Sequence, residues 1–163
     1  MNQTVSAENS PRKNLKGTLV LFLSVVAGIF LFMLGAILVG QIKGPLVPAL
    51  NKYHTLIMVA MPAISFVCLL IAKRVFTKEI DLAKNSLKSL NEKLNQHRTA
   101  LIKYIIICEA PVMLSIVLFL LTGNFVFQVY AGVFIGFMLT MLPARKKVAE
   151  QLQLDALQQQ ELE

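Results

Sequence analysis

The sequence predicts an all-helical fold: a bundle of four transmembrane helices, with both termini in the cytoplasm and a cytoplasmic helical hairpin between the second and third helices. Three observations predict it. Of the 163 residues, 56% are hydrophobic and 15% are charged, whereas ordinary soluble domains are about 25% charged. The apolar residues form long blocks, and a membrane span needs about 20 of them. The basic residues gather at alternate ends of these blocks.

Four apolar blocks are long enough to span a membrane, at residues 17–41, 55–72, 100–122 and 125–142. Only the third contains charged residues, Lys103 and Glu109. In hydrocarbon, helices and closed barrels alone satisfy the backbone, and barrel strands alternate apolar with polar residues. These blocks are apolar on every face, which predicts helices. The first block is longer than the apolar core of a cleaved signal, so we interpret it as a retained anchor.

Basic residues predict the orientation of the helices. If alternate connecting segments share a side, fourteen Lys and Arg residues lie on one side and two, Lys43 and Lys52, on the other. The positive-inside rule puts the fourteen in the cytoplasm. The net charge of +7 then predicts attraction to anionic lipid head groups. Nucleic acid is not expected as a partner, because aromatic residues do not interleave with the basic ones.

The same pattern divides the chain into a cytoplasmic tail (1–16), a transmembrane domain (17–143) and a second cytoplasmic tail (144–163). Glycine and proline in the outer loop 41–54 stop helix propagation. The turn at 122–124 is so short that the third and fourth helices must be antiparallel neighbours. The C-terminal tail is rich in glutamine, and a weak apolar stripe of Val148, Leu152 and Leu157 is compatible with an interfacial helix or with disorder.

The segment 73–99 between the second and third helices has a helical pattern. Ser89 and Glu92 have the spacing of a capping box, which predicts a helix that begins there and continues into the third span. The second span is expected to extend past Arg74, and the two extensions to pack as a hairpin. We interpret the hairpin as structural, with recruitment of a partner as the alternative. Its apolar residues recur every three or four positions: Ile80, Ala83, Leu87, Leu90 and Leu94.

Glu109 is the acidic residue inside a span and the main candidate for function. A charge at the centre of a membrane helix costs about 2.5–3.5 kcal/mol on insertion scales. Glu109 lies nine residues after the start of its block, roughly 13 Å into a core of about 30 Å. Ser24 and Ser65 lie at the same depth and are candidate hydrogen-bond partners. Two interpretations stay open: a proton or cation site, or a protonated carboxyl that holds helices together.

Two prolines and two glycines surround this depth. Pro62 and Pro111 each remove a helical hydrogen bond, and interrupted helices at matched depth mark some transporter sites. Proline also merely kinks many membrane helices, and we interpret both as kinks. Gly132 and Gly136 form a GxxxG pattern, which permits close packing of helices.

Enzyme chemistry has no support in the sequence. Cys68 and Cys108 are lone thiols, and His54 and His97 lack neighbouring ligands. No nucleotide-binding, zinc-protease or serine-hydrolase motif occurs. We therefore expect no enzyme activity, no cofactor and no metal.

One resemblance extends over about a quarter of the chain. It starts at His97-Arg98-Thr99-Ala100, has Glu109-Ala110-Pro111 at its centre, and ends in Leu120-Leu121-Thr122-Gly123-Asn124. This segment resembles a family of small, uncharacterised four-helix membrane proteins of Bacteroidota, in which glycine takes the place of Ala110. The resemblance implies a bacterial inner-membrane location and brings no activity.

The Glu-Ala-Pro core also resembles the ion-binding helix of rotary-ATPase proteolipid subunits, although the first span lacks their glycine stripe. Three functions follow from the sequence. The first is a structural or accessory membrane component, and the second a small proton- or cation-coupled transporter or channel-like oligomer that uses Glu109. The third is a membrane anchor that recruits a partner through the 73–99 hairpin. A homo-oligomer or a membrane complex is compatible with the first two.

Overall fold

Helices form the regular structure, and no β-strand occurs in residues 11–85 and 89–160, which the computed structural model describes. Three helices are long and apolar enough to cross a membrane: α1 (Pro11–Lys43), α2 (His54–Lys84), which continues the 3-10 helix η2 (Pro48–Tyr53), and α3 (Leu90–Thr122). The all-helical prediction is confirmed. The other helices are α4 (Val126–Leu139), α5 (Arg145–Leu152) and α6 (Ala156–Gln160).

The three long helices extend beyond their predicted apolar blocks. α1 includes Pro11, and proline suits a first helical turn because its missing N–H has no partner there. It ends at Lys43, before Gly44 takes a φ of 68°. α2 runs past Arg74 to Lys84. Hydropathy marks the apolar part of each helix, whereas polar turns at the ends continue the same backbone hydrogen bonding.

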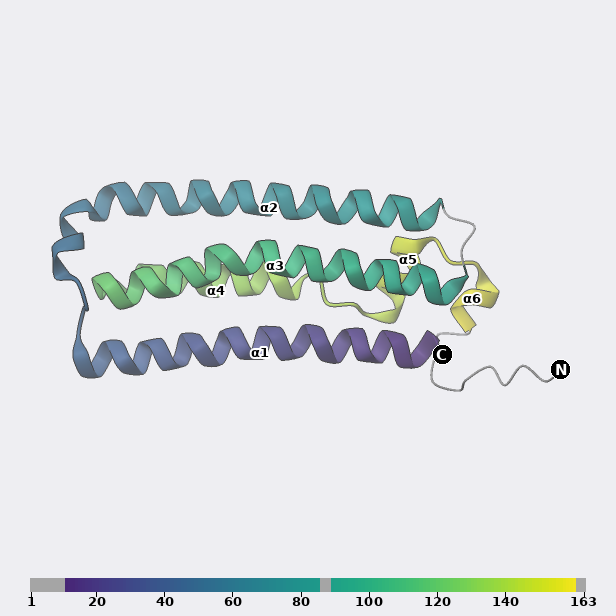
Figure 1. Ribbon diagram of the computed structural model, residues 1–163, viewed down its shortest axis with the longest axis horizontal. Coiled ribbons are helices and arrows are strands. Elements are labelled where there is room, and N and C mark those ends of the chain that lie inside the picture. The colour runs from purple at the N-terminus through teal and green to yellow at the C-terminus, as the bar shows by residue number, and fades with distance from the viewer. Residues whose placement is uncertain (1–10, 86–88, 161–163) are drawn as a thin grey trace.

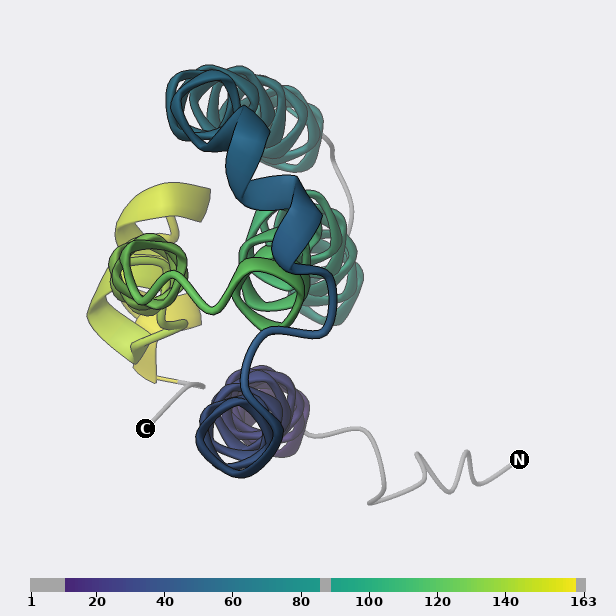
Figure 2. The same ribbon diagram turned by 90° about the vertical axis from the view of Figure 1, so that its left-hand side faces the viewer.

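α3 lies at the centre of the bundle (Figure 1). Figure 2 shows α1 and α2 on opposite sides of α3, with α4 on a third side. α3 packs against all three. Among the described helices, none covers the fourth side of α3.

One end of the bundle holds the N-terminal ends of α1 and α3, the C-terminal end of α2, and α5, and we call it the basic end (Figure 1). Here Ile80, Ala83, Leu90 and Leu94 are buried, while Leu87 lies outside the described residues. Glu92 accepts hydrogen bonds from the N–H and the hydroxyl of Ser89, at 3.0 and 3.1 Å. The capping box predicted at the start of α3 is therefore present. The side of the membrane on which this end lies stays a prediction.

The fourth apolar block forms a shorter helix than predicted. α4 has 14 residues, which makes it about 21 Å long, less than a hydrocarbon core of about 30 Å. It ends at Leu139, three residues before the predicted boundary. Pro143 disfavours helical geometry at the residue before it, and the ammonium group of Lys147 donates to the carbonyl of Thr140. The chain reaches α5 through residues 140–144.

Part of the C-terminal tail packs on the bundle. Val148 and Leu152 of α5 are buried, and α5 contacts α2 and α3. Leu157, the third residue of the predicted stripe, is 74% exposed. Of the predicted apolar stripe, only the two residues in α5 pack against the bundle.

The opposite end of the bundle is closed by the loop between α1 and η2. The N–H groups of Leu46 and Val47 donate to the carbonyls of Leu120 and Leu121, at 3.0 and 2.9 Å. These carbonyls lie in the last turn of α3, where no helical donor reaches them. The loop thus supplies hydrogen bonds that the end of α3 lacks.

The turn between α3 and α4 is as short as predicted. Gly123 has a φ of 71°, and its N–H donates to the carbonyl of Phe119 at 2.7 Å. A Cβ atom on Gly123 would come within 3.3 Å of the Cβ of Pro45. Glycine is required here both by its backbone conformation and by the neighbouring loop, and the turn makes α3 and α4 antiparallel neighbours.

Candidate functional site

Glu109 lies in the middle of α3 and is half-buried, between the buried Cys108 and the exposed Ala110. Ile106, three residues earlier and adjacent on the helix surface, is 60% exposed. Within residues 11–85 and 89–160, no hydrogen bond or ion pair joins Glu109 to another residue. The acid in the apolar part of α3 therefore has no polar partner in the described chain.

Glu109 borders the side of α3 that no described helix covers. Exposed residues repeat at spacings of three and four along this side, which we call the open face. The open face comprises Lys103, Ile106, Ala110, Leu114 and Val117. Apart from Lys103 at one end, it is apolar, so Glu109 is the polar group at its centre.

Two contacts give the register of α1 beside α3. Near the basic end, the side-chain amide of Asn14 donates to the side-chain oxygen Oδ1 of Asn95 at 2.8 Å. Near the opposite end, a Cβ atom on Gly40 would come within 2.9 Å of Cζ of Phe119. Interpolation between these contacts places Glu109 level with residues 28–30 of α1. Gly28, at this level, is exposed, and no atom lies within 4 Å of where its Cβ would lie.

Neither predicted serine partner reaches Glu109. The hydroxyl of Ser24 donates to the carbonyl of Val20 in its own helix, at 2.9 Å, and its side chain is exposed. Ser65 is buried on α2 but forms no hydrogen bond with Glu109. On α1, Ser24 lies four to six residues before the level of Glu109 given by these contacts, so the predicted match in depth does not hold for it.

Both prolines lie inside continuous helices. α2 passes through Pro62 and α3 through Pro111 without interruption. The hydroxyl of Ser115 donates to the carbonyl of Pro111 at 2.9 Å. The described part of the chain therefore has no unwound segment at this depth of the kind that binds substrate in transporters.

The GxxxG pattern of α4 does not pack against any other helix that the structure describes. Gly132 and Gly136 are exposed, and nothing lies within 4 Å of a Cβ built on either. The residues of α4 that pack inward are Phe127, Gln128, Ala131, Ile135 and Met138. Periodicity placed the two glycines on one side of α4, but that side faces outward.

A buried histidine connects three helices at the basic end, which the sequence did not predict. His97 on α3 is hydrogen-bonded to the side-chain oxygen of Gln151 on α5, at 2.8 Å, and meets the ring of Phe76 on α2 edge-on. Burial lowers the pKa of His97, as does the nearby Lys147, against the opposing effect of the Gln151 hydrogen bond. A signal was present in the sequence, because His97 continues the stripe of Leu90 and Leu94.

Two further polar contacts and one buried amide were also missed. The ammonium group of Lys103 pairs with the carboxylate of Glu79 on α2, with 2.5 Å between nitrogen and oxygen. The amide of Asn124 meets the ring of His54, joining the α3–α4 turn to the start of α2. Gln128 is buried in α4, and neither its nitrogen nor its oxygen has a hydrogen-bond partner in the described residues. These pairings depend on helix register, which periodicity does not supply.

Metal ligands do not converge in the described parts of the chain. Residues 11–85 and 89–160 contain no group of three or more His, Cys, Asp or Glu side chains able to hold an ion. Cys68 and Cys108 are both free thiols. What the arrangement offers chemically is one carboxyl group at the edge of an apolar, uncovered helix face.

No protein-family model, curated protein or solved structure matches this chain. Three helices long and apolar enough to cross a bilayer make it compatible with a membrane protein in contact with lipid.

Proposed function

We propose that this chain is a non-enzymatic, multi-pass protein of a bacterial inner membrane and an accessory component of a membrane complex. In this proposal α1 to α4 lie in the membrane, α4 with the help of residues 140–144, and both termini lie in the cytoplasm. The fourteen-to-two distribution of basic residues supports that orientation. The complex forms on the open face of α3, around Glu109.

The observation that carries the proposal is the lack of a partner for Glu109. Ionisable groups in membrane helices usually face a bundle interior or pair with one another, because an isolated one costs several kcal/mol. Glu109 is half-buried and has no such contact within the described residues. A carboxyl group that bonds to no other helix of its own chain does not hold those helices together. Its partner is therefore sought outside the chain.

The chemistry of the open face indicates what kind of partner fits. A carboxyl group is satisfied by a hydroxyl, amide or basic side chain at the same depth. A second copy of this chain, apposed at the same level, would present another Glu109 and two like charges. The partner that fits best is a transmembrane helix of a different protein with a hydrogen-bond donor near mid-membrane. Ile106 and Leu114 supply apolar contact area on either side of Glu109.

A second function is favoured by the same exposure of Glu109. In a homo-oligomer, a carboxyl group reachable from a subunit interface is able to bind and release a proton or a cation. The continuous helices α2 and α3 give less support to this function, because transporter sites commonly use interrupted helices.

Recruitment of a partner through the 73–99 segment has weaker support. The apolar stripe expected to bind that partner is largely used inside the chain, since Ile80, Ala83, Leu90 and Leu94 are buried. A recruiting surface needs such side chains to be exposed.

Site-specific photo-cross-linking in native membranes tests the proposal. A benzophenone amino acid is placed at Ile106 on the open face or, as a control, at Val59, which is 70% exposed on α2. We expect an adduct from Ile106 whose partner peptide is transmembrane and carries a donor side chain within about one helical turn of the attachment point. An adduct between two copies would support the ion-site function instead. Equal protein adducts from both positions, or none, would contradict a complex on this face.

A further inference from the structure

A cleft at the basic end is built by two segments far apart in the sequence. It has a volume of about 280 Å³ and lies between the first turns of α1 and the connection from α4 to α5. α1 contributes Arg12, Leu15, Lys16 and Leu19, and the connection contributes Leu142, Pro143, Ala144 and Arg145.

The cleft has an apolar floor and a basic rim. Leu15 and Pro143 are buried, whereas Arg12, Lys16 and Arg145 are exposed. No acidic residue is among the described residues that line it, and none of the three cations has an ion pair there. Three uncompensated positive charges around apolar walls are suited to an amphiphile with a negative head.

We propose that this cleft binds one anionic phospholipid. Its phosphate lies among Arg12, Lys16 and Arg145, and the carbons next to the head group lie against Leu15 and Leu19. Guanidinium groups bind phosphate oxygens through paired hydrogen bonds, and basic pockets between helices at the cytoplasmic side recognise anionic head groups. A free phosphate ion would meet the same cations but would gain nothing from the leucines.

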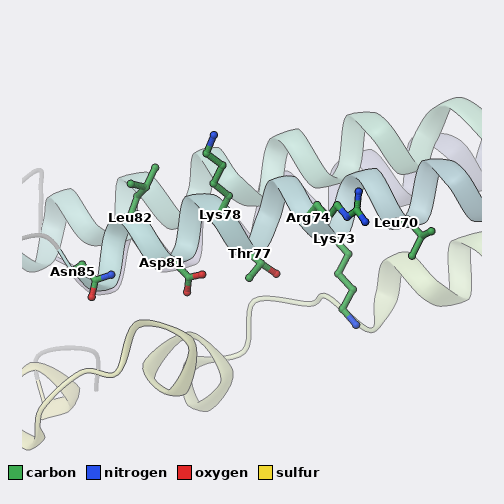
Figure 3. A pocket seen from close by; sticks show the side chains of 8 residues that line it. All are labelled: Leu70, Lys73, Arg74, Thr77, Lys78, Asp81, Leu82 and Asn85. Carbon is green, nitrogen blue, oxygen red and sulfur yellow. The ribbon is translucent and has the colours of Figure 1, made fainter.

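A second basic surface shows that charge alone does not make such a site. A groove of about 600 Å³ lies along the basic half of α2, where Figure 3 shows Lys73, Arg74 and Lys78. Seven of the eight described residues that line it belong to α2, Asp81 among them, and the eighth is Asn85, the C-cap of the same helix. In this groove a phosphate would meet cations from one helix and the Asp81 carboxylate. In the cleft it would meet cations from two segments and no acidic residue among those described. The α2 groove therefore provides a matched control.

The proposed lipid would link α1 to the segment between α4 and α5. Its phosphate is shared by cations from both segments, so binding adds a link that covalent structure and side-chain packing do not supply. A ligand that binds only the folded state raises its stability by mass action. We expect anionic lipid to raise the unfolding temperature of the protein, and neutral lipid to do so less.

The test uses the full chain in maltoside micelles, with dioleoylphosphatidylglycerol, dioleoylphosphatidylcholine or inorganic phosphate added. Lipid bound per chain is counted by native mass spectrometry, and unfolding temperature is measured in parallel. Replacing Arg12, Lys16 and Arg145 by Gln is expected to lower phosphatidylglycerol affinity roughly tenfold or more, since each basic residue contributes about 1 kcal/mol. Replacing Lys73, Arg74 and Lys78 by Gln removes the same charge and is expected to change it less than about twofold. If a triple variant does not fold, K16Q and K78Q make the same comparison at smaller amplitude.

Equal losses in the two triple variants would overturn the proposal in favour of diffuse attraction. A shift of equal size with inorganic phosphate would overturn it in favour of a soluble anion. The inference rests on the proposed placement of the chain in a membrane, but the test in micelles needs neither the orientation nor the protein partner. If the unmutated chain shows no preference for phosphatidylglycerol but still forms the Ile106 adduct, the lipid site is wrong and the proposed function stands.

Discussion

The C-terminal end of α3 and its middle differ in how their polar groups are satisfied. At the end, the carbonyls of Leu120 and Leu121 accept bonds from the α1–η2 loop, and that of Phe119 accepts from Gly123. In the middle, Glu109 has no hydrogen bond or ion pair within the described residues. The polar groups of the first region are satisfied within the described part of the chain, whereas Glu109 in the second is not.

The difference indicates where the chain is self-sufficient. A helix end satisfied by its own loop needs no other molecule. A half-buried carboxyl group on an apolar face costs free energy until something outside the chain binds it. Selection for stability alone would favour an apolar residue at position 109. We therefore interpret the end of α3 as part of the fold and its middle as part of an assembly.

The largest effect is expected from removing the carboxyl group. E109L should stabilise the isolated chain yet reduce the Ile106 adduct roughly tenfold or more, because a buried charge-assisted hydrogen bond is lost. E109Q keeps the shape and one acceptor and should retain part of the adduct. Adduct yield by immunoblot gives the comparison. An unchanged yield in E109L would mean that the open face binds without its carboxyl group.

The closed end is expected to respond in stability rather than in assembly. G123A forces a Cβ into the left-handed region and against Pro45, which should lower the free energy of unfolding by about 1–2 kcal/mol. G136A is the control, since nothing lies near that position, and it should be neutral or mildly stabilising. Unfolding in mixed micelles measures both. Equal effects would mean that the turn is less restrictive than its geometry indicates.

A smaller stability change is expected at Gln128, a buried amide without a hydrogen-bond partner among the described residues. Q128L removes two unsatisfied polar atoms and should raise the free energy of unfolding by about 1 kcal/mol. The same micelle titration detects it. A decrease of similar size would show that Gln128 is hydrogen-bonded in the membrane, and that this end of α4 also depends on an outside molecule.

The smallest effect is expected from pH at the basic end. Burial is the main cause that lowers the pKa of His97 below its ordinary value of 6.5, and the positive charge of Lys147 lowers it further. The unfolded chain then binds the proton more readily than the folded one, so stability is complete above pH 6.5 and declines as pH falls through the lowered pKa. Unfolding temperatures between about pH 7.5 and pH 5 should show this decline, and H97Q should lack it. A decline of the same size in H97Q would assign it to another group.

The sequence predicted the features that depend on composition and local chemistry. Long apolar blocks predicted helices, Ser89 and Glu92 predicted the start of α3, and Gly123 predicted the short turn. Each of these is decided within a few residues. Glu109 lies near the middle of α3, as counting along the helix predicts, whereas its depth in a membrane stays a prediction.

Features that depend on register and facing were not predicted. Counting along the sequence predicts that Ser24 lies at the depth of Glu109. Contacts near both ends of α1 instead place residues 28–30 level with Glu109. Gly132 and Gly136 have the spacing of a packing motif, yet they face outward, because nothing in the spacing says which side of α4 meets α3. The early end of α4 depends on Pro143 and Lys147, which lie after the apolar block that predicted the helix.

Carbodiimide labelling of Glu109, read by mass spectrometry, tests the central claim most directly, because carbodiimides modify protonated carboxyl groups that they reach. We expect Glu109 to be protected in native membranes, where the partner helix binds it, and to be labelled once the chain is purified to single copies. Ready labelling in native membranes, declining with pH and slowed by a particular cation, would contradict the complex. Glu109 would then be a working ion site on an uncovered face of α3.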